Sequence, residues 1–388
     1  MPEASFPRRV IYGEPAGSAL LGLLSAINAS RILLVTDRGV SELGFFKRIV
    51  DELAASGLYI IVYDKVEPEP ALSVADEVAR LIVGESIDAI VAVGGGSVID
   101  AAKAGLVKAV RPDVRVEDVA PFNPLGLELR KPVLIAVPTT SGTGSDASYG
   151  IVLTKHQDGR GVKIAVGSPE VVPFASILDE EATLKLPRKL TVGTAVDALS
   201  HSIEALVATT SNPLSDALAY HSAELIFTNL PKVVENPDDR EARLKLHVAA
   251  TMAGMAFTNS GLGLAHAIAH PLGAALRVHH GTIVGLVLPY VVEYNYRSSS
   301  ARSKYERLRR ILEDINGLPA MATLADHIKS LYKTVGQPLR IRDLGVSEGK
   351  YKSVVDYVSQ EALHDPNISF APIIPEPDEI RGILERIY

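Results

Sequence analysis

Apolar runs and amphipathic stretches alternate along the first part of the chain. Four runs consist almost entirely of apolar residues, as expected of strands that are covered on both faces. Helix-like stretches lie between them, at 41–56, 71–84 and 98–110. This alternation predicts an α/β domain with a parallel sheet. The predicted strands are residues 31–37, 58–64, 88–94 and 132–138.

The pattern changes near residues 178–187, where the short apolar runs end. From there to the end of the chain, the apolar positions recur with the spacing of helices. We therefore predict two domains. The α/β domain covers residues 1–182, and an all-helical domain covers residues 183–388.

Composition narrows the function classes. The formal net charge of -7 offers no basic stripe, so we expect neither a nucleic-acid partner nor an anionic membrane surface. No apolar run approaches the roughly 18 residues of a membrane span, and the first residues lack the core of a signal peptide, so we expect a cytoplasmic protein. The chain has no cysteine, which excludes disulfides, thiolate nucleophiles and cysteine-bound zinc.

The residues after the third strand form the first candidate site. The tetrapeptide Gly94, Gly95, Gly96, Ser97 joins this strand to a predicted helix. Glycine lets the backbone approach a ligand closely, and the start of a helix offers unpaired N–H groups to a phosphate. Ile99 stands where a complete dinucleotide motif has its third glycine, so an ordinary strand-to-helix turn is the alternative.

Two further positions follow strands at the same edge of the predicted sheet. Thr139, Thr140 and Thr143 belong to a hydroxyl-rich loop, which by itself could be a simple turn. Asp37 follows the first strand, where a carboxylate can accept hydrogen bonds from an adenosine ribose. It could instead cap a helix, and the neighbouring Arg38 would suit a 2′-phosphate. NAD(H) is therefore the preferred cofactor, and NADP(H) stays an alternative.

Histidine is concentrated in the helical half, where seven of the ten lie between His201 and His280. Asp197 and His201 are four residues apart, as are His266 and His270, so each pair shares one helix face. His280 follows in a turn-like stretch. A single histidine on an apolar helix is usually a packing residue. A carboxylate with several imidazoles, however, suits Fe(II) or Zn(II).

Four motifs carry a resemblance to a known family. They are G-G-G-S-V-I-D at 94–100, P-T-T-S-G-T-G-S at 138–145, V-D-A-L-S-H at 196–201, and G-L-G-L-A-H-A-I-A-H-P-L-G at 261–273 followed by H-G at His280. By their order and spacing, the chain resembles the iron-containing (group III) alcohol dehydrogenases over nearly its whole length. The resemblance implies an N-terminal Rossmann-like dinucleotide-binding domain and an all-α C-terminal domain for metal and substrate.

The resemblance also assigns roles to residues. It implies that Asp197, His201, His266 and His280 bind the metal and that Phe257 lines the substrate pocket. Together with Asp37, the residues implied to bind the dinucleotide are Gly94, Gly95, Gly96, Ser97, Asp100, Thr139, Thr140, Thr143 and Lys163.

The chemistry that the resemblance implies is hydride transfer between a small alcohol and a nicotinamide, with the metal as a Lewis acid. His270, one turn after His266, is a candidate for proton transfer or for orienting a ligand, and helix packing is its alternative role. The family also implies a homodimer.

One departure from the family pattern lies near the C-terminus. Relatives often carry N-P-R there, whereas this chain lacks the arginine and reads Asp365, Pro366, Asn367, Ile368.

Three functions are compatible with these residues. The leading one is a metal-dependent NAD(P) dehydrogenase for a primary alcohol, a diol or a hydroxyaldehyde. The second is a related metal- and NAD-dependent enzyme, such as a glycerol-type dehydrogenase or a dehydroquinate synthase-like lyase. A phosphorylated substrate would need cationic side chains that the surroundings of His266 do not supply. The third is a non-catalytic dinucleotide-binding or scaffold protein with structural histidines.

Overall fold

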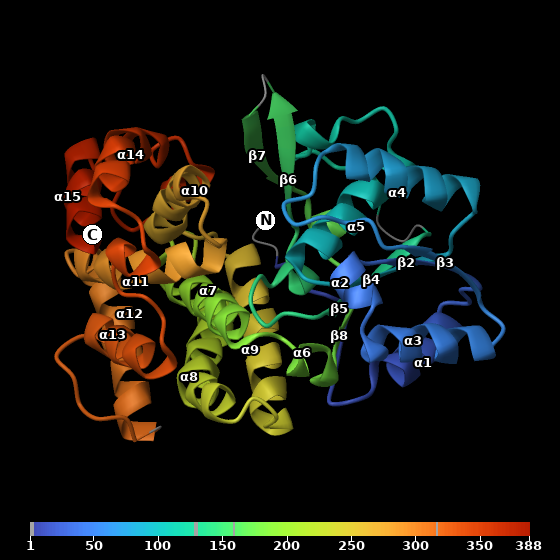
Figure 1. Ribbon diagram of the computed structural model, residues 1–388, viewed down its shortest axis with the longest axis horizontal. Coiled ribbons are helices and arrows are strands. Elements are labelled where there is room, and N and C mark those ends of the chain that lie inside the picture. The colour runs from blue at the N-terminus through green and yellow to red at the C-terminus, as the bar shows by residue number, and fades with distance from the viewer. Residues whose placement is uncertain (1–3, 128–130, 158–159, 316) are drawn as a thin grey trace. The chain divides into compact units, whose positions relative to one another are not determined.

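The computed structural model describes residues 4–127, 131–157, 160–315 and 317–388 (Figure 1). The chain divides into two compact units, Met1–Lys185 and Leu186–Tyr388. The described strands all belong to the first unit, and the second unit is built from helices. Within the described ranges, no helix is long and apolar enough to cross a membrane.

A six-stranded sheet forms the centre of the first unit. All of its pairings are parallel, as the apolar runs predicted. The predicted strands are present, and three of them are almost wholly buried because both faces of the sheet are covered. In spatial order the strands are β1 (Arg9–Tyr12), β8 (Ala175–Leu178), β5 (Val133–Pro138), β4 (Ala89–Gly94), β2 (Arg31–Val35) and β3 (Tyr59–Tyr63).

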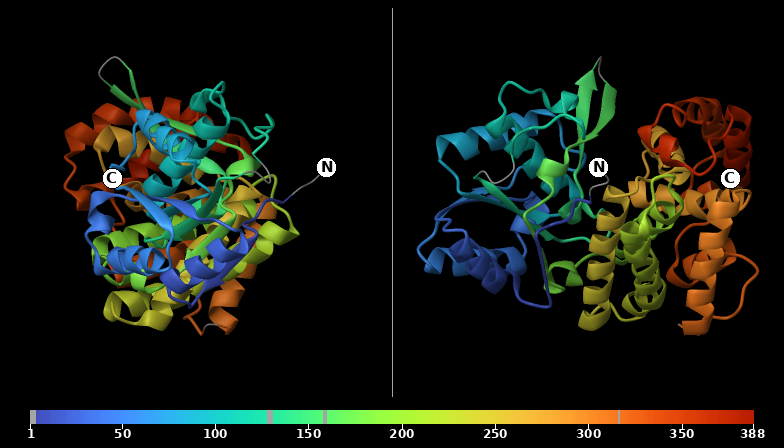
Figure 2. Two further views of the ribbon diagram at one scale, coloured as in Figure 1. Left: turned by 90° about the vertical axis from the view of Figure 1, so that its right-hand side faces the viewer. Right: turned by 180° about the vertical axis from the view of Figure 1, so that it is seen from behind.

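Helices cover both faces of this sheet, because successive side chains of a strand point in opposite directions. Leu33 and Val35 belong to the same apolar cluster as α4 (Ser73–Gly84) and α5 (Gly96–Val110). Ile32 and Leu34 belong to the cluster of α1 (Ala16–Ala26) and α3 (Gly44–Ala55). Figures 1 and 2 show the sheet between the two helix pairs. The predicted α/β fold is confirmed.

Several elements of the first unit escaped the hydrophobic pattern. The strands β1 and β8 have only 4 residues each, too few to form a recognisable run. An antiparallel hairpin, β6 (Gly150–Gln157) and β7 (Arg160–Gly167), lies outside the main sheet. The remaining short elements are α2 (Arg38–Ser41), α6 (Glu181–Leu184) and the 3-10 helices Val116–Asp118, Ser145–Ala147 and Pro169–Val171.

One apolar core holds the helices of the second unit together. Polar residues start several helices, as the side chain of Asn212 does for α8 and that of Thr323 for α13. The all-helical prediction is confirmed. The helices are α7 (Arg188–Val207), α8 (Pro213–Glu235), α9 (Arg240–Thr258), α10 (Leu264–Leu276), α11 (His280–Asn295), α12 (Ser299–Arg310), the π-helix Ile311–Ile315, α13 (Leu324–Val335), the 3-10 helix Ile341–Leu344, α14 (Glu348–Glu361), the 3-10 helix Pro366–Phe370 and α15 (Pro377–Ile387).

Candidate metal centre and dinucleotide site

Helix α7 supplies the first two candidate metal ligands. Every residue of this helix from Thr191 to Val207 is buried, because the helix runs through the apolar core of the second unit. Asp197 and His201 lie one turn apart on it, and His201 Nε2 is 3.8 Å from Asp197 Oδ1. Two polar side chains thus face each other inside the core of the second unit.

Two other helices bring imidazoles to the same carboxylate. His266 lies in the first turn of α10, and His280 is the first residue of α11. The Nε2 atoms of both lie 3.7 Å from Asp197 Oδ1. The ligand atoms of Asp197, His201 and His266 all lie within 4.8 Å of one another, close enough to hold one metal ion. The structure therefore brings the four predicted metal ligands together.

Glycine lets α11 approach α7 closely enough for this geometry. A Cβ atom at Gly281 would lie 2.2 Å from the carbonyl oxygen of Gly193 and 3.0 Å from the Cβ atom of Asp197. No larger side chain fits without moving a backbone. His280 directly precedes Gly281, so this backbone contact sets the position of its imidazole beside Asp197.

The charges of the cluster fit a cation. Within the described residues, the buried atoms Asp197 Oδ1 and His266 Nε2 have no hydrogen-bond partner. Burial raises the pKa of Asp197, but the imidazoles of His201 and His280 lower it well below its usual range. Burial lowers the pKa of His266, but Glu204 and Asp197 raise it to about 9. The site attracts positive charge, and its oxygen and nitrogen donors suit Fe(II) or Zn(II).

Glu204 is a buried residue beside the cluster that the sequence analysis did not single out. It follows His201 by one turn on α7, and its side chain is 3 % exposed. One carboxylate oxygen hydrogen-bonds with His266 Nδ1, and the other accepts the backbone N–H of Ala265 at 2.5 Å. Asp197, His201 and Glu204 have the spacing i, i+4, i+7 of one helix face, which is the signal that could have identified it.

His270 and Phe257 also lie next to the cluster. His270 Nδ1 is 2.6 Å from Asp365 Oδ2, and the His270 ring stacks on that of His280 with 5.1 Å between centroids. Burial raises the pKa of Asp365, but its hydrogen bond with His270 lowers it, and the net shift is downward. The Phe257 ring is 4.7 Å from the His201 ring. Asp365 belongs to the segment that departs from the family pattern.

The first unit gathers most of the predicted dinucleotide residues at the carboxyl edge of its sheet. Gly94 ends β4 and pairs with Pro138, which ends the neighbouring strand β5. A Cβ atom at Gly96 would lie 2.8 Å from the Thr143 side chain, so the hydroxyl-rich loop packs on the start of α5. The helices after β2 and β4 cover opposite faces of the sheet. Asp37 and the glycine turn thus flank the switch point at which such sheets bind ligands.

Asp37 and Lys163 have protein partners in the structure. Asp37 accepts a hydrogen bond from the backbone N–H of Val40 at 2.9 Å and so caps the short helix α2. This is the capping role that the sequence offered as the alternative. Lys163 Nζ lies 2.8 Å from Glu69, so it forms an ion pair at the surface of the first unit.

Asp100 belongs to a buried polar network. Its two oxygens accept hydrogen bonds from the Ser145 hydroxyl and, at 2.9 Å, from the backbone N–H of Val152. Lys103 Nζ donates to Ser145 Oγ at 3.0 Å and to the carbonyl of Gly150 at 2.8 Å, and lies 3.7 Å from Asp100. Burial lowers the pKa of Lys103 to about 8 and raises that of Asp100. The network joins α5 to the end of the hydroxyl-rich loop.

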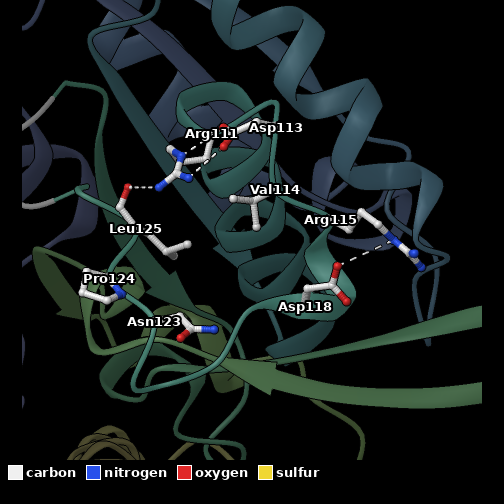
Figure 3. A pocket seen from close by; sticks show the side chains of 8 residues that line it. All are labelled: Arg111, Asp113, Val114, Arg115, Asp118, Asn123, Pro124 and Leu125. Atoms are coloured by element: carbon white, nitrogen blue, oxygen red, sulfur yellow. Dashed lines mark hydrogen bonds and ion pairs between the residues drawn. The ribbon is translucent and has the colours of Figure 1, made fainter.

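A surface hollow of the first unit contains none of the predicted site residues (Figure 3). It lies beyond Val110, where α5 ends, whereas the glycine turn lies at the start of that helix. The guanidinium of Arg111 donates to Asp113 at 2.8 Å and to the Leu125 carbonyl at 3.1 Å, so its charge is already compensated. The residues that line it are Arg111, Asp113, Val114, Arg115, Asp118, Asn123, Pro124 and Leu125.

Known proteins are similar to this chain in sequence and in fold. Residues 7–180 match the family "Iron-containing alcohol dehydrogenase", and residues 191–388 match "Fe-containing alcohol dehydrogenase family, C-terminal". The NAD-dependent methanol dehydrogenase of Bacillus methanolicus is 33% identical over 98% of each chain. The NADPH-dependent butanol dehydrogenase of Clostridium saccharobutylicum is 32% identical over 99% of this chain and 97% of its own. A solved structure of a 1,3-propanediol oxidoreductase superposes with a TM-score of 0.90 at 30% identity over 100% of each chain.

The α/β unit, the helical unit and the buried carboxylate–imidazole cluster together define a metal-dependent oxidoreductase. The chain belongs to the iron-containing alcohol dehydrogenase family. The predicted resemblance and the predicted enzyme class are confirmed, and the non-catalytic alternative is excluded. The two relatives are named for different nicotinamide cofactors, so family membership alone leaves the choice between NAD and NADP open.

Proposed function

We propose that the enzyme interconverts a small alcohol and its aldehyde or ketone by hydride transfer with NAD(P). The substrate is a primary alcohol, a diol or a hydroxyaldehyde. The carrying observation is the buried group Asp197, His201 and His266, whose ligand atoms lie within 4.8 Å of one another. Similar proteins are named for methanol, butanol and 1,3-propanediol, which supports a small alcohol. Helix α10, which supplies His266, carries no lysine or arginine, so a phosphorylated substrate is disfavoured.

The metal of this proposal is Fe(II), with Zn(II) as the alternative ion. Its ligands are Asp197, His201, His266 and His280, because the three imidazoles surround one carboxylate oxygen at 3.7 to 3.8 Å. When bound, the ion supplies a Lewis acid that polarises the substrate oxygen. Phe257 offers an apolar surface beside His201 to the carbon chain of the substrate.

NAD(H) is the proposed cofactor, with NADP(H) as the alternative. Gly94, Gly95 and Gly96 allow the pyrophosphate to approach the free N–H groups at the start of α5. Asp37 accepts hydrogen bonds from the adenosine ribose and repels a 2′-phosphate. Asp100 acts indirectly, through Ser145, because both of its oxygens already bind protein donors. The other proposed contacts are Ser97, Thr139, Thr140, Thr143 and Lys163.

His270 is the proposed proton-transfer residue. Its Nδ1 hydrogen-bonds with Asp365, which leaves Nε2 as the atom that can take a proton from the substrate side. Replacing His270 with alanine should lower kcat about 10²-fold, the usual contribution of a positioned acid or base, while metal content stays unchanged. If the variant keeps its kcat and loses only thermal stability, His270 is a packing residue.

The first experiment strips the protein of metal with a chelator under anaerobic conditions. Fe(II), Zn(II) or no metal is then added back, and aldehyde-dependent NADH oxidation is followed with several short aldehydes. We expect Fe(II) to restore activity and the stripped protein to be inactive. No activity with either ion would overturn the proposed reaction, and equal activity without metal would overturn the proposed ligand set.

A second experiment tests the cofactor. Replacing Asp37 with glycine removes the carboxylate that faces a 2′-phosphate, so the ratio of kcat/KM for NADPH to that for NADH should rise about tenfold or more, equivalent to about 1.4 kcal/mol. An unchanged ratio would leave Asp37 with only its capping role.

The family resemblance also leads us to propose a cytoplasmic homodimer. Sedimentation analysis tests the oligomeric state, and cell fractionation tests the location.

A further inference from the structure

Glu204 is a buried carboxylate that the proposed chemistry does not use. Its residue is 2 % exposed, and it lies on the same face of α7 as Asp197 and His201. In the described part of the chain, no lysine or arginine forms an ion pair with it. Its hydrogen-bond partners are the imidazole of His266 and the backbone N–H of Ala265. A buried carboxylate is energetically costly unless hydrogen-bond donors compensate it, and these two donors do so for Glu204.

The contact with Ala265 replaces a missing helix cap. Gly263, the residue before α10, has no side chain that could accept a hydrogen bond from the first turn. One oxygen of Glu204 accepts the Ala265 N–H instead, and a negative charge at a helix start is favourable. A Cβ atom at Gly263 would lie 3.1 Å from that oxygen, so glycine leaves room for the carboxylate.

The contact with His266 determines which ring nitrogen carries the proton. An ionised carboxylate can only accept hydrogen bonds, so Nδ1 of His266 must be the donor. With Nδ1 engaged by Glu204, Nε2 is the ring nitrogen left to coordinate an ion, and it is the atom that lies 3.7 Å from Asp197 Oδ1. Ala265 and His266 are adjacent in the chain, so one carboxylate fixes both the start of α10 and the orientation of the imidazole.

We propose that Glu204 is the positioning residue of the metal centre, which holds His266 with Nδ1 protonated and Nε2 directed at the ion. This inference rests on the proposed function, because it requires His266 to be a metal ligand. A carboxylate behind a ligating histidine also raises the basicity of the coordinating nitrogen. Glu204 touches neither substrate nor cofactor in this role and acts only through His266.

Replacing Glu204 with glutamine separates the two contacts. An amide has one oxygen and one NH2 group, so it can satisfy the fixed N–H of Ala265 only if it donates to His266 Nδ1. That arrangement keeps the cap of α10 but moves the imidazole proton to Nε2, the atom that faces the ion. Glu204→Gln should therefore weaken Zn(II) binding roughly 10- to 100-fold, as measured by competition with a chelator. The unfolding midpoint of the metal-free variant should stay near that of the wild type.

Glu313 provides a matched control in the same unit. It also hydrogen-bonds with a buried histidine, His327, at 2.9 Å, but neither residue belongs to the metal cluster. Glu313→Gln should leave Zn(II) affinity within about twofold of the wild type. Equal weakening in the two variants would mean that Glu204 acts through general stability, and Zn(II) affinity unchanged in Glu204→Gln would also overturn the proposal.

A second measurement uses the wild-type protein and does not depend on whether Glu204→Gln folds. Nitrogen-15 NMR of the zinc-loaded wild type, with His266 assigned by its replacement, should report a protonated Nδ1 and a zinc-bound Nε2. Zinc bound through Nδ1 would overturn the role of Glu204. If His266→Ala itself keeps the wild-type Zn(II) affinity, the proposed ligand set fails instead, so the two failures are distinguishable.

Discussion

Two buried polar clusters, one around Asp100 in the first unit and one around Asp197 in the second, differ in how their charges are compensated. In the first unit, Lys103 neutralises Asp100, and its ammonium donates hydrogen bonds to Ser145 and Gly150. In the second unit, Asp197 is surrounded by imidazoles, and no ammonium or guanidinium is paired with it among the described residues. We call the first cluster closed, because Asp100 and Lys103 compensate each other's charges. We call the second cluster open, because Asp197 Oδ1 has no hydrogen-bond partner among the described residues.

The shifts in pKa show the same difference. Burial lowers the pKa of Lys103 to about 8, because desolvation of the ammonium outweighs the attraction of Asp100. Burial lowers the pKa of His266, but the neighbouring carboxylates of Glu204 and Asp197 stabilise a protonated ring and raise this pKa to about 9. A closed network stabilises the fold, whereas an open network of carboxylate and imidazole groups is suited to bind a cation.

The largest effect is expected from removing a ligand of the open cluster. His266→Ala or Asp197→Ala should lower kcat by about 10³-fold or more and should lower metal content in parallel, because the Lewis acid is lost. Metal analysis and steady-state kinetics on the same preparation measure both. The affinity for NADH should stay within about twofold. A variant with full metal content and full kcat would contradict the assignment of that ligand.

The next largest effect is expected in the closed cluster. Lys103→Met leaves Asp100 buried without its charge partner, which should lower the free energy of unfolding by about 3 kcal/mol, as loss of one partner of a buried pair does. Denaturant unfolding measures it. Lys163→Met is the matched control, because Lys163 pairs with Glu69 at the surface and should cost about 1 kcal/mol or less. Equal losses in both variants would mean that the Asp100 network is not a closed structural unit.

A third prediction concerns the ion as a stabiliser. Free Zn(II) at 100 times its dissociation constant should raise the free energy of unfolding by about 2.7 kcal/mol, because only the folded protein holds the ligands together. Denaturant unfolding with and without a chelator measures this increment. It should persist in Lys103→Met and disappear in His266→Ala. An increment that survives in His266→Ala would place the stabilising ion elsewhere.

The smallest effect is expected at Asp88, a partly exposed carboxylate whose charge is compensated by protein donors. Asp88 accepts hydrogen bonds from the backbone N–H groups of Ser30 and Arg31 and lies 3.1 Å from Lys131. Burial raises its pKa, but these partners lower it from 3.8 to about 2. Because the folded value is the lower one, the stability it contributes is present above pH 4 and is lost as the pH falls towards 2.

Asp88→Asn should therefore lower the free energy of unfolding by about 1 kcal/mol at pH 7, since the site is partly exposed to solvent. The difference between the wild type and the variant should shrink steadily between pH 4 and pH 3, the range that urea unfolding can follow. A difference that stays constant over this range would show that Asp88 stabilises the strands without its charge.

Much of the fold could be predicted because its signals are local. The apolar runs of β2, β4 and β5 identify buried parallel strands, since such strands need apolar residues on both faces. The hairpin β6–β7 and the short strands β1 and β8 could not be found in this way. They are defined by pairing with distant segments, such as the register of Arg9 with Ala175, which leaves no periodic pattern in either segment.

One pair of the metal cluster was predictable for the same reason, because Asp197 and His201 share one helix face at a spacing of four residues. That His266 and His280 join this pair was implied by the family resemblance, because they lie on other helices. The partners of the site residues were not predictable. The carboxylate of Glu204 meets His266, and that of Asp365 meets His270, only through tertiary packing. Asp100 illustrates the converse, because its place in a family motif suggested a cofactor contact, whereas the structure places both of its oxygens on protein donors.

The glycine contact between α7 and α11 has a consequence for the order in which the site forms. Asp197 and His201 are neighbours as soon as α7 is helical, which is a fast and local event. His280 reaches them only when the backbone of α11 settles on Gly193, and this requires a long loop of chain to close. The complete set of four ligands therefore exists only in the docked arrangement of α7 and α11, so full affinity for an ion is a property of the assembled helical unit and not of α7 alone.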